Sequence, residues 1–168
     1  MNPMSAYLPQ DRRHALACGA AIPDYADGAA LFADISGFTP LTEALRIALG
    51  PRQGSEALSD QINITYDALI TQVDAYRGSV IGFAGDAITC WFDAADGPPA
   101  PRAAACAVGM QQAMAAFAQI ALPGGGRTSL GLKVAVACGP ARRMLVGDPA
   151  IQMLDLLAGG DGGAGGDC

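Results

Sequence analysis

The sequence predicts an α+β fold in which an antiparallel-rich sheet carries its helices mainly on one face. Apolar runs with strand character alternate with stretches of helical periodicity along the 168 residues. Their order is strand, helix, helix, strand, strand, helix, strand, strand, which matches the ferredoxin-like β-α-β-β-α-β pattern with one extra helix. The length suits one domain. We expect an irregular lead-in at 1–27, the domain at 28–158 and a flexible Gly/Asp tail at 159–168.

The first predicted strand lies at about 29–35, and two helices follow it. Thr39 can cap the first helix and Pro40 suits its first turn. Gly50-Pro51 should stop this helix, and the next should begin near Ser55. Apolar side chains recur at spacings of three and four along this second helix, which predicts one buried face.

The second half of the chain should begin with a β-hairpin. Two apolar runs, 79–84 and 87–92, flank Gly85-Asp86, so the acid should lie at the hairpin tip. The other elements are expected at 102–121 (helix), 130–137 (strand) and 144–146 (short strand), with a turn at Gly139-Pro140.

Composition and charge argue against several partners and locations. The 51% of hydrophobic residues is enough for a full core, while a net charge of −6 argues against nucleic acid or an anionic membrane as partner. No apolar run approaches the roughly 18 residues of a membrane span. Five cysteines, an odd number, and no signal peptide favour a reduced cytoplasm. Cys90, Cys106 and Cys138 lie in apolar runs and are expected in the core.

Two carboxylates, Asp34 and Asp86, each follow a buried apolar run. Either one alone would more often be a turn or cap residue. A hairpin beside the first strand would bring them together, and two carboxylates in contact repel unless a cation lies between them. Mg²⁺ or Mn²⁺ takes such hard oxygen ligands together with carbonyls and phosphates. The carbonyl of Ile35 is placed to join them.

A phosphate seat is expected directly after Asp34. The turn contains Ser36, Gly37, Phe38 and Thr39 and leads into a helix start, whose first N–H groups lack partners within the helix. Gly37 lets the backbone approach a ligand closely. A plain capped helix is the alternative for this segment alone. Its position next to an acid favours a site for a metal with a polyphosphate.

These residues carry a family resemblance. F-A-D-I-S-G-F-T at 32–39 with F-A-G-D-A at 83–87 resembles the class III nucleotidyl cyclase (adenylate/guanylate cyclase) catalytic domain. It looks most like the first cyclase domain of the soluble, bicarbonate-responsive adenylyl cyclases and their bacterial relatives. The resemblance covers about 28–157 and includes G-L-K-V-A-V-A-C-G-P at 131–140.

The resemblance implies a lyase that converts ATP or GTP to a 3′,5′-cyclic nucleotide and pyrophosphate with two Mg²⁺ or Mn²⁺ ions, in cyclic nucleotide signalling. Asp34 and Asp86 match the family's catalytic, metal-bridging aspartates, and Ile35 matches its carbonyl ligand. Such sites form between two cyclase domains, so a second cyclase domain, in a homo- or heterodimer, is the expected partner. The nucleotide-binding positions are Ser36, Gly37, Phe38 and Thr39, with Gly85 in the hairpin turn.

The sequence departs from the family pattern in three places. Gly82 stands where the family has a base-reading lysine. The family's late Asn and Arg have no counterpart, and the domain is expected to be truncated at its C-terminus. Arg142 and Arg143 do not match that motif and are interpreted as solvated edge charges, whereas Lys133 in the late strand is interpreted as an outward-facing charge. The chain is therefore expected to supply the metal-and-phosphate half of a paired site.

Two other functions remain open at this stage. The missing residues favour a catalytically incomplete, cyclase-like module that binds nucleotide or only a partner. A related palm-fold enzyme such as a diguanylate cyclase is disfavoured, because Ala84-Gly85-Asp86-Ala87 stands in the hairpin in place of its G-G-D-E-F signature.

Overall fold

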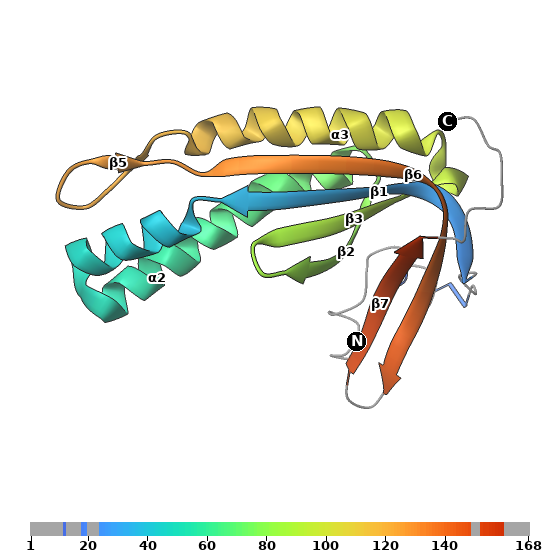
Figure 1. Ribbon diagram of the computed structural model, residues 1–168, viewed down its shortest axis with the longest axis horizontal. Helices are drawn as coiled ribbons and strands as arrows, with labels where there is room; N and C mark the ends of the chain where they lie inside the picture. The colour runs from blue at the N-terminus through green and yellow to red at the C-terminus, as the bar shows by residue number, and fades with distance from the viewer. Residues whose placement is uncertain (1–11, 13–17, 20–23, 149–151, 160–168) are drawn as a thin grey trace.

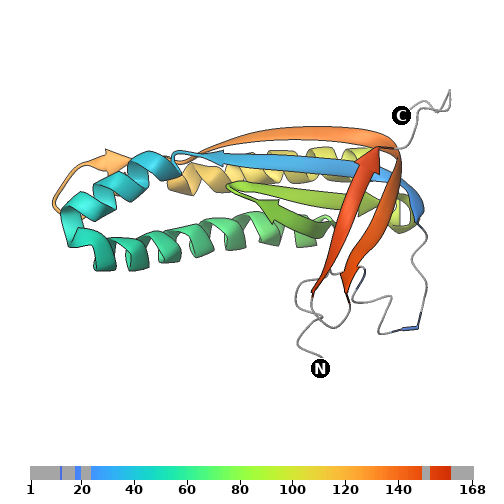
Figure 2. The same cartoon turned by 60° about the horizontal axis from the view of Figure 1, so that its bottom comes forward.

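A computed structural model of the protein describes residues 12, 18–19, 24–148 and 152–159. Most of the predicted lead-in, and the predicted tail from residue 160 onward, lie outside these residues. The described chain forms a five-stranded sheet in the order β2-β3-β1-β6-β7, and all of its pairings are antiparallel. Helices α2 and α3 pack on one face of the sheet (Figures 1 and 2). The predicted α+β class is therefore confirmed.

The elements have the following bounds. The five strands of the main sheet are β1 (Tyr25–Ser36), β2 (Ser79–Ala84), β3 (Ala87–Asp93), β6 (Gly131–Asp148) and β7 (Gln152–Gly159). The helices are α2 (Phe38–Ala75) and α3 (Pro99–Met114), with 3₁₀ turns η2 (Ala94–Asp96) and η3 (Ala115–Phe117). A separate short hairpin is made by β4 (Ile120–Ala121) and β5 (Arg127–Thr128).

Strand β1 lies at the centre of the sheet, between β3 and β6. Its side chains alternate between the two faces, as the period of a strand requires. Leu31, Ala33 and Ile35 are buried and point to the helices. The even-numbered residues from Ala30 to Ser36 lie on the opposite face, which we call the open face. Phe32, for example, is 45% exposed there.

Helix α2 consists of two helical segments joined at a break, as the sequence predicts. Gly50 has φ 79° and ψ 173°, which are not helical values, and Pro51 begins the second segment. The second segment therefore starts four residues before the predicted position. Thr65, Leu69 and Val73 are fully buried and fix this segment to the sheet. The predicted buried face is confirmed.

The path of β6 corrects the prediction of a turn at Gly139-Pro140. The strand continues through both residues, pairs with β1 up to Arg142 and then pairs with β7 (Figure 1). The backbone N–H of Arg143 points toward β1, where it donates to the carbonyl of Asp24. Successive N–H groups of a strand point to opposite sides, so an N–H at position 140, three residues earlier, would point away from β1 and toward the side of β7. Pairing with β7 begins only at Ala141, so no partner would accept a bond from position 140, and proline is tolerated there. A proline there costs no ladder bond. Gly139, with φ 144°, accommodates the bend.

Three further elements differ from the expectations. Strand β1 begins at Tyr25 rather than near residue 29. Strand β7 was not predicted, although its sequence contains apolar residues among the polar ones. The predicted helix over 102–121 begins earlier, at Pro99, and ends at Met114. Phe117 is buried in the core just beyond it, and its carbonyl accepts a bond from the Leu130 N–H, which joins the two ends of the segment that contains the β4–β5 hairpin.

Arg143 and Trp91 lie together where the end of the sheet curls over the open face. The Trp91 ring covers Gly28, where a Cβ atom would lie 2.2 Å from the ring. The guanidinium carbon of Arg143 lies 5.9 Å from the centre of the Trp91 ring, and Arg143 is fully buried. The interpretation of Arg143 as a solvated charge is therefore wrong. Arg142 is exposed, as predicted, and stacks on Tyr25.

The cysteine side chains of the described residues differ in exposure. Cys90 and Cys106 are buried in the core as expected, and burial raises the pKa of the Cys106 thiol to about 12. Cys138 is exposed, which corrects the expectation that it is a core residue. The face of β6 on which it lies is not covered at this position.

Arg143→Ala should lower the free energy of unfolding by about 2–4 kcal/mol, because a fully buried side chain stacked on Trp91 is replaced by a cavity. Arg142→Ala is the matched control and should cost under about 1 kcal/mol, because Arg142 is exposed. Urea denaturation followed by the fluorescence of Trp91, the only tryptophan, measures both changes. Equal losses would contradict the role given to Arg143.

Candidate functional site

Asp34 lies on the open face near the C-terminal end of β1. It pairs with Ala87 of β3 on one side and with Lys133 of β6 on the other. Directly paired residues of antiparallel strands have their side chains on the same face. Asp34 is half-buried, so its carboxylate is held by the sheet but accessible from this face.

Asp86 lies in the turn of the β2–β3 hairpin, as the sequence predicts. Gly85 has φ 60°, and both turn residues are exposed. The backbone N–H of Ile35 donates to the carbonyl of Asp86 at 3.1 Å, so the second acid lies beside the residue that follows the first acid. In an extended strand the N–H and C=O of one residue point to the same side. The carbonyl of Ile35 therefore also faces this turn, while its side chain is buried in the core.

Tyr66 of α2 lies close to both acids. Its hydroxyl donates to the carbonyl of Gly85 at 3.4 Å, and its ring meets Phe83 edge-on with the ring centres 5.1 Å apart. Burial raises the pKa of the Tyr66 hydroxyl, and the negative charges of Asp86 and Asp34 raise it further. One hydroxyl thus experiences the field of both carboxylates.

The helix start that follows Ser36 has the backbone features expected of a phosphate seat. Gly37 is the N-cap of α2 with φ 102°, and no side chain caps the helix. A Cβ atom on Gly37 would lie 2.4 Å from the carbonyl oxygen of Ser129, so glycine is required there. Thr39 lies inside the helix, which corrects its predicted capping role. Phe38 is buried and fixes the first turn to the core.

A pocket of about 620 Å³ opens beside this helix start. Ser36 and Gly37 form one side of it, and the chain entering β6 forms the other. The guanidinium of Arg127 is held at its rim by Gln119, with a distance of 2.6 Å between Nη1 and Oε1. The full lining is Ser36, Gly37, Pro40, Ala118, Arg127, Thr128, Ser129, Leu130 and Gly131.

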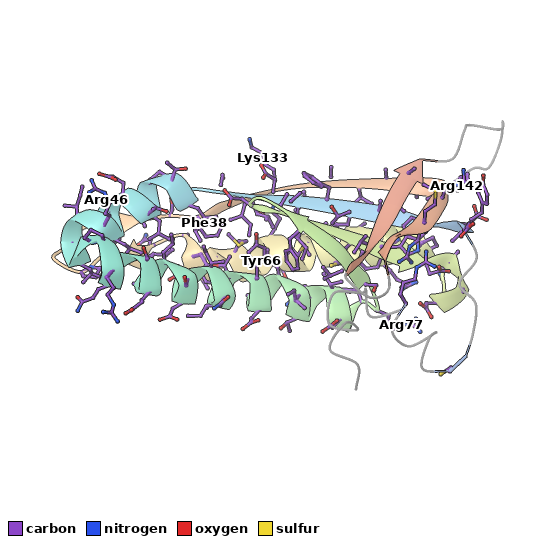
Figure 3. The ribbon with its side chains drawn as sticks, turned by 90° about the horizontal axis from the view of Figure 1, so that it is seen from below. Phe38, Arg46, Tyr66, Arg77, Lys133 and Arg142 are labelled. Atoms are coloured by element: carbon purple, nitrogen blue, oxygen red, sulfur yellow. The ribbon has the colours of Figure 1, made fainter. Side chains whose placement is uncertain are left out.

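Lys133 of β6 is a basic residue that lies beside Asp34. It is exposed, as expected of an outward-facing charge, but it pairs with Asp34 and so faces the candidate site. Figure 3 shows it directed away from the helices, over the open face. The neighbouring pair toward the pocket is Ser36 with Gly131. The only lysine of the sequence therefore lies beside the candidate metal ligand Asp34, next to the pair that lines the pocket. The alternation of the strand at 130–137 could have indicated its face, but not its partner strand.

The two acids and the Ile35 carbonyl supply only hard oxygen ligands. No group of three or more His, Cys, Asp or Glu gathers in the described part of the chain. A zinc-type cage is thus absent from that part, whereas two carboxylates and a carbonyl fit Mg²⁺ or Mn²⁺, which take further oxygens from water and substrate phosphates. All the predicted site residues lie along the end of β1, the hairpin turn and the start of α2.

The fold is shared with solved nucleotidyl cyclases. A bacterial light-regulated adenylyl cyclase superposes with a TM-score of 0.68 at 17% identity, over 92% of this chain and 43% of that chain. The adenylyl cyclase CyaB from P. aeruginosa gives 0.60 at 22% identity, over 80% of this chain and 66% of that one. The guanylate cyclase domain of RhGC from Catenaria anguillulae, solved with GTP, gives 0.61 at 17% identity, over 82% and 69%. The chain thus has the fold of a class III nucleotidyl cyclase catalytic domain.

Sequence comparison points to a more particular relative. Adenylate cyclase type 10 of Oryctolagus cuniculus and of Homo sapiens are each 40% identical to this chain over 65 residues. The matched segment spans 39% of this chain and only 4% of each relative. No protein-family model matches the sequence. The resemblance inferred from the two Asp motifs is confirmed by this homology and by the shared fold.

None of the helices in the described residues combines the length and the hydrophobicity that a membrane-crossing helix needs.

Gly37→Ala should destabilise the protein by about 1–3 kcal/mol, because the left-handed backbone and the Ser129 carbonyl both exclude a Cβ atom. Gly82→Ala is the matched control, since a Cβ at Gly82 meets nothing within 4 Å and its φ is not positive. Its effect should stay within about 1 kcal/mol. Urea midpoints measure both, and a neutral Gly37→Ala would contradict the tight turn.

Proposed function

We propose that the chain is a nucleotidyl cyclase domain that supplies the metal-and-phosphate half of a site shared with a second cyclase domain. The observation that carries this proposal is the convergence of Asp34, the Asp86 turn and the uncapped start of α2 on one end of β1. The homology to adenylate cyclase type 10 and the fold shared with adenylyl and guanylyl cyclases support it.

The proposed reaction converts ATP or GTP to a 3′,5′-cyclic nucleotide and pyrophosphate. The 3′-oxygen of the ribose bonds to the α-phosphorus, and the bond from that phosphorus to the oxygen bridging to the β-phosphorus breaks. The 3′-hydroxyl gives up its proton, and pyrophosphate carries away the bonding pair. Two Mg²⁺ or Mn²⁺ ions, when bound, would activate the 3′-hydroxyl and neutralise the triphosphate.

The residues of this chain have distinct parts in that reaction. Asp34 and Asp86 would hold the ions, with the carbonyl of Ile35 as a third ligand. The free N–H groups at the start of α2, from Ser36 to Thr39, would bind phosphate oxygens. Gly85 would let the nucleotide approach the hairpin. Lys133, across the strand from Asp34, would contact the triphosphate with its ammonium group.

The open face is the surface on which a second cyclase domain would complete the site. It carries Asp34 and Lys133, and its exposed Phe32 offers an apolar contact. Space is also open at Gly82, where a Cβ would meet nothing within 4 Å. A partner could place its own base-reading group there.

Asp34→Ala and Asp86→Ala should each abolish Mn²⁺-dependent binding of a non-hydrolysable ATP or GTP analogue, because each removes a metal ligand. Calorimetric titration with Mn²⁺ and then with EDTA measures this. Asp60→Ala, which removes an exposed acid of α2, is the matched control and should bind as the parent does. Equal affinity of all three variants for the nucleotide analogue would contradict the proposed metal site.

The reaction itself is tested by incubating the chain, alone and with a complementary cyclase domain, with ATP or GTP and Mn²⁺, followed by mass spectrometry of the products. A 3′,5′-cyclic product supports the cyclase. Metal-dependent binding without any product in both samples would instead support a catalytically incomplete nucleotide-binding module.

Lys133→Ala should weaken binding of the Mn²⁺–nucleotide complex by about tenfold, the value of one charge-assisted contact to phosphate. Lys133→Arg should retain most of it. The control is Arg52→Ala, whose side chain is 92% exposed and far along α2. Lys133 is the sequence's only lysine, so nucleotide should also protect it from an amine-reactive label, measured by mass spectrometry. Labelling unchanged by saturating nucleotide would contradict this contact.

A further inference from the structure

The hairpin that carries Asp86 ends in solvent. Ala84, Gly85 and Asp86 are all exposed, and a Cβ at Gly85 would meet nothing within 4 Å. The position of the second acid therefore depends on bonds that reach the turn from outside the hairpin. Within the described residues, the structure gives two of these: Ile35 N–H to the Asp86 carbonyl, and the Tyr66 hydroxyl to the Gly85 carbonyl.

The bond from Tyr66 comes from a rigid support. Thr65, Leu69 and Val73 on the same segment of α2 are fully buried, so the helix cannot shift without disturbing the core. Figure 3 shows Tyr66 on the side of α2 that faces the sheet. Its ring packs edge-on against Phe83 of β2, two residues before the turn. The ring of Tyr66 thus contacts Phe83 and its hydroxyl contacts Gly85, two residues further along the hairpin.

We propose that Tyr66 is a positioning residue that fixes the Gly85-Asp86 turn, and with it the second carboxylate, at the distance from Asp34 that divalent metal binding needs. The proposal deepens the proposed function and rests on it. Metal ligands must be held within about 0.5 Å of their productive geometry, and the groups that orient them affect metal affinity without touching the metal.

The electrostatics of Tyr66 agree with this position. The pKa of its hydroxyl is raised first by burial and then by the charges of Asp86 and Asp34. The hydroxyl, which donates to the Gly85 carbonyl, therefore lies in the field of both acids, although α2 follows the first acid in the chain and precedes the second.

The test uses Tyr66→Phe, which removes the hydroxyl but keeps the ring against Phe83. Mn²⁺ alone is the probe, and its affinity is measured by electron paramagnetic resonance. We expect a Kd about 3- to 10-fold higher, the effect of losing one hydrogen bond that orients a ligand. Tyr66→Leu, which also loses the ring contact, should raise the Kd further.

The matched control is Tyr76→Phe, at the C-cap of the same helix and also half-buried, which should leave the Mn²⁺ affinity unchanged. Hydrogen exchange of a peptide spanning 83–88 provides a readout specific to positioning. Exchange there should be faster in Tyr66→Phe than in the parent, while urea denaturation shows a folded protein. A general loss of stability would instead speed exchange throughout the chain, and that outcome would overturn the proposal.

Failure of this inference and failure of the proposed function give different results. If the parent binds Mn²⁺, Asp86→Ala does not, and Tyr66→Phe binds as the parent does, Tyr66 has no positioning role while the metal site stands. If the parent itself binds no Mn²⁺, the proposed metal site is contradicted, and the positioning role of Tyr66 is overturned with it.

Discussion

The register of β1 against its two neighbours is the constraint on which the rest of the structure depends. Because Asp34 pairs with both Ala87 and Lys133, its carboxylate lies on the face away from the helices. Ile35, one position later, is buried among the helices and holds the strand in place. A slip by one residue would bury the acid in the core and expose its apolar neighbours, at a large cost in free energy. The core packing thus determines where the acid lies.

The two ends of the open face have different roles. At one end β6 bends, and Arg143 covers Trp91, so this part of the face is closed by the chain itself. At the other end Phe32, Asp34 and Lys133 remain accessible. Gly139 lies between the two regions along β6, because the strand pairs with Asp34 at Lys133 before this glycine and reaches Arg143 after it. The surface left accessible is therefore the one that carries the candidate metal ligand Asp34.

Sequence reasoning predicted the parts of this arrangement that depend on local pattern. The hairpin at Gly85-Asp86, the break at Gly50 and the placement of both acids at strand ends follow from turn chemistry and apolar periodicity. It failed where a distant contact decides the local structure. Gly139-Pro140 looks like a turn, but the edge of β6 needs no N–H there. Arg143 looks like a surface charge until the bend places Trp91 beneath it. Lys133 is exposed as predicted, but its place beside Asp34 could not be predicted because its partner strand was unknown.

The charges of the site explain why metal and nucleotide should bind together. Asp34 and Asp86 are held near each other by the Ile35–Asp86 bond, and the pKa of the Tyr66 hydroxyl is raised by the charges of both. Without a cation they repel each other, and a polyphosphate would add to that repulsion. Lys133 and the start of α2 offset only part of the negative charge. In the proposed site, divalent cations between the acids and the phosphates would supply the rest, so metal and nucleotide should each raise the affinity of the chain for the other. That coupling distinguishes a working half-site from a pocket that merely accepts an anion, because an anion pocket would bind nucleotide equally well in EDTA.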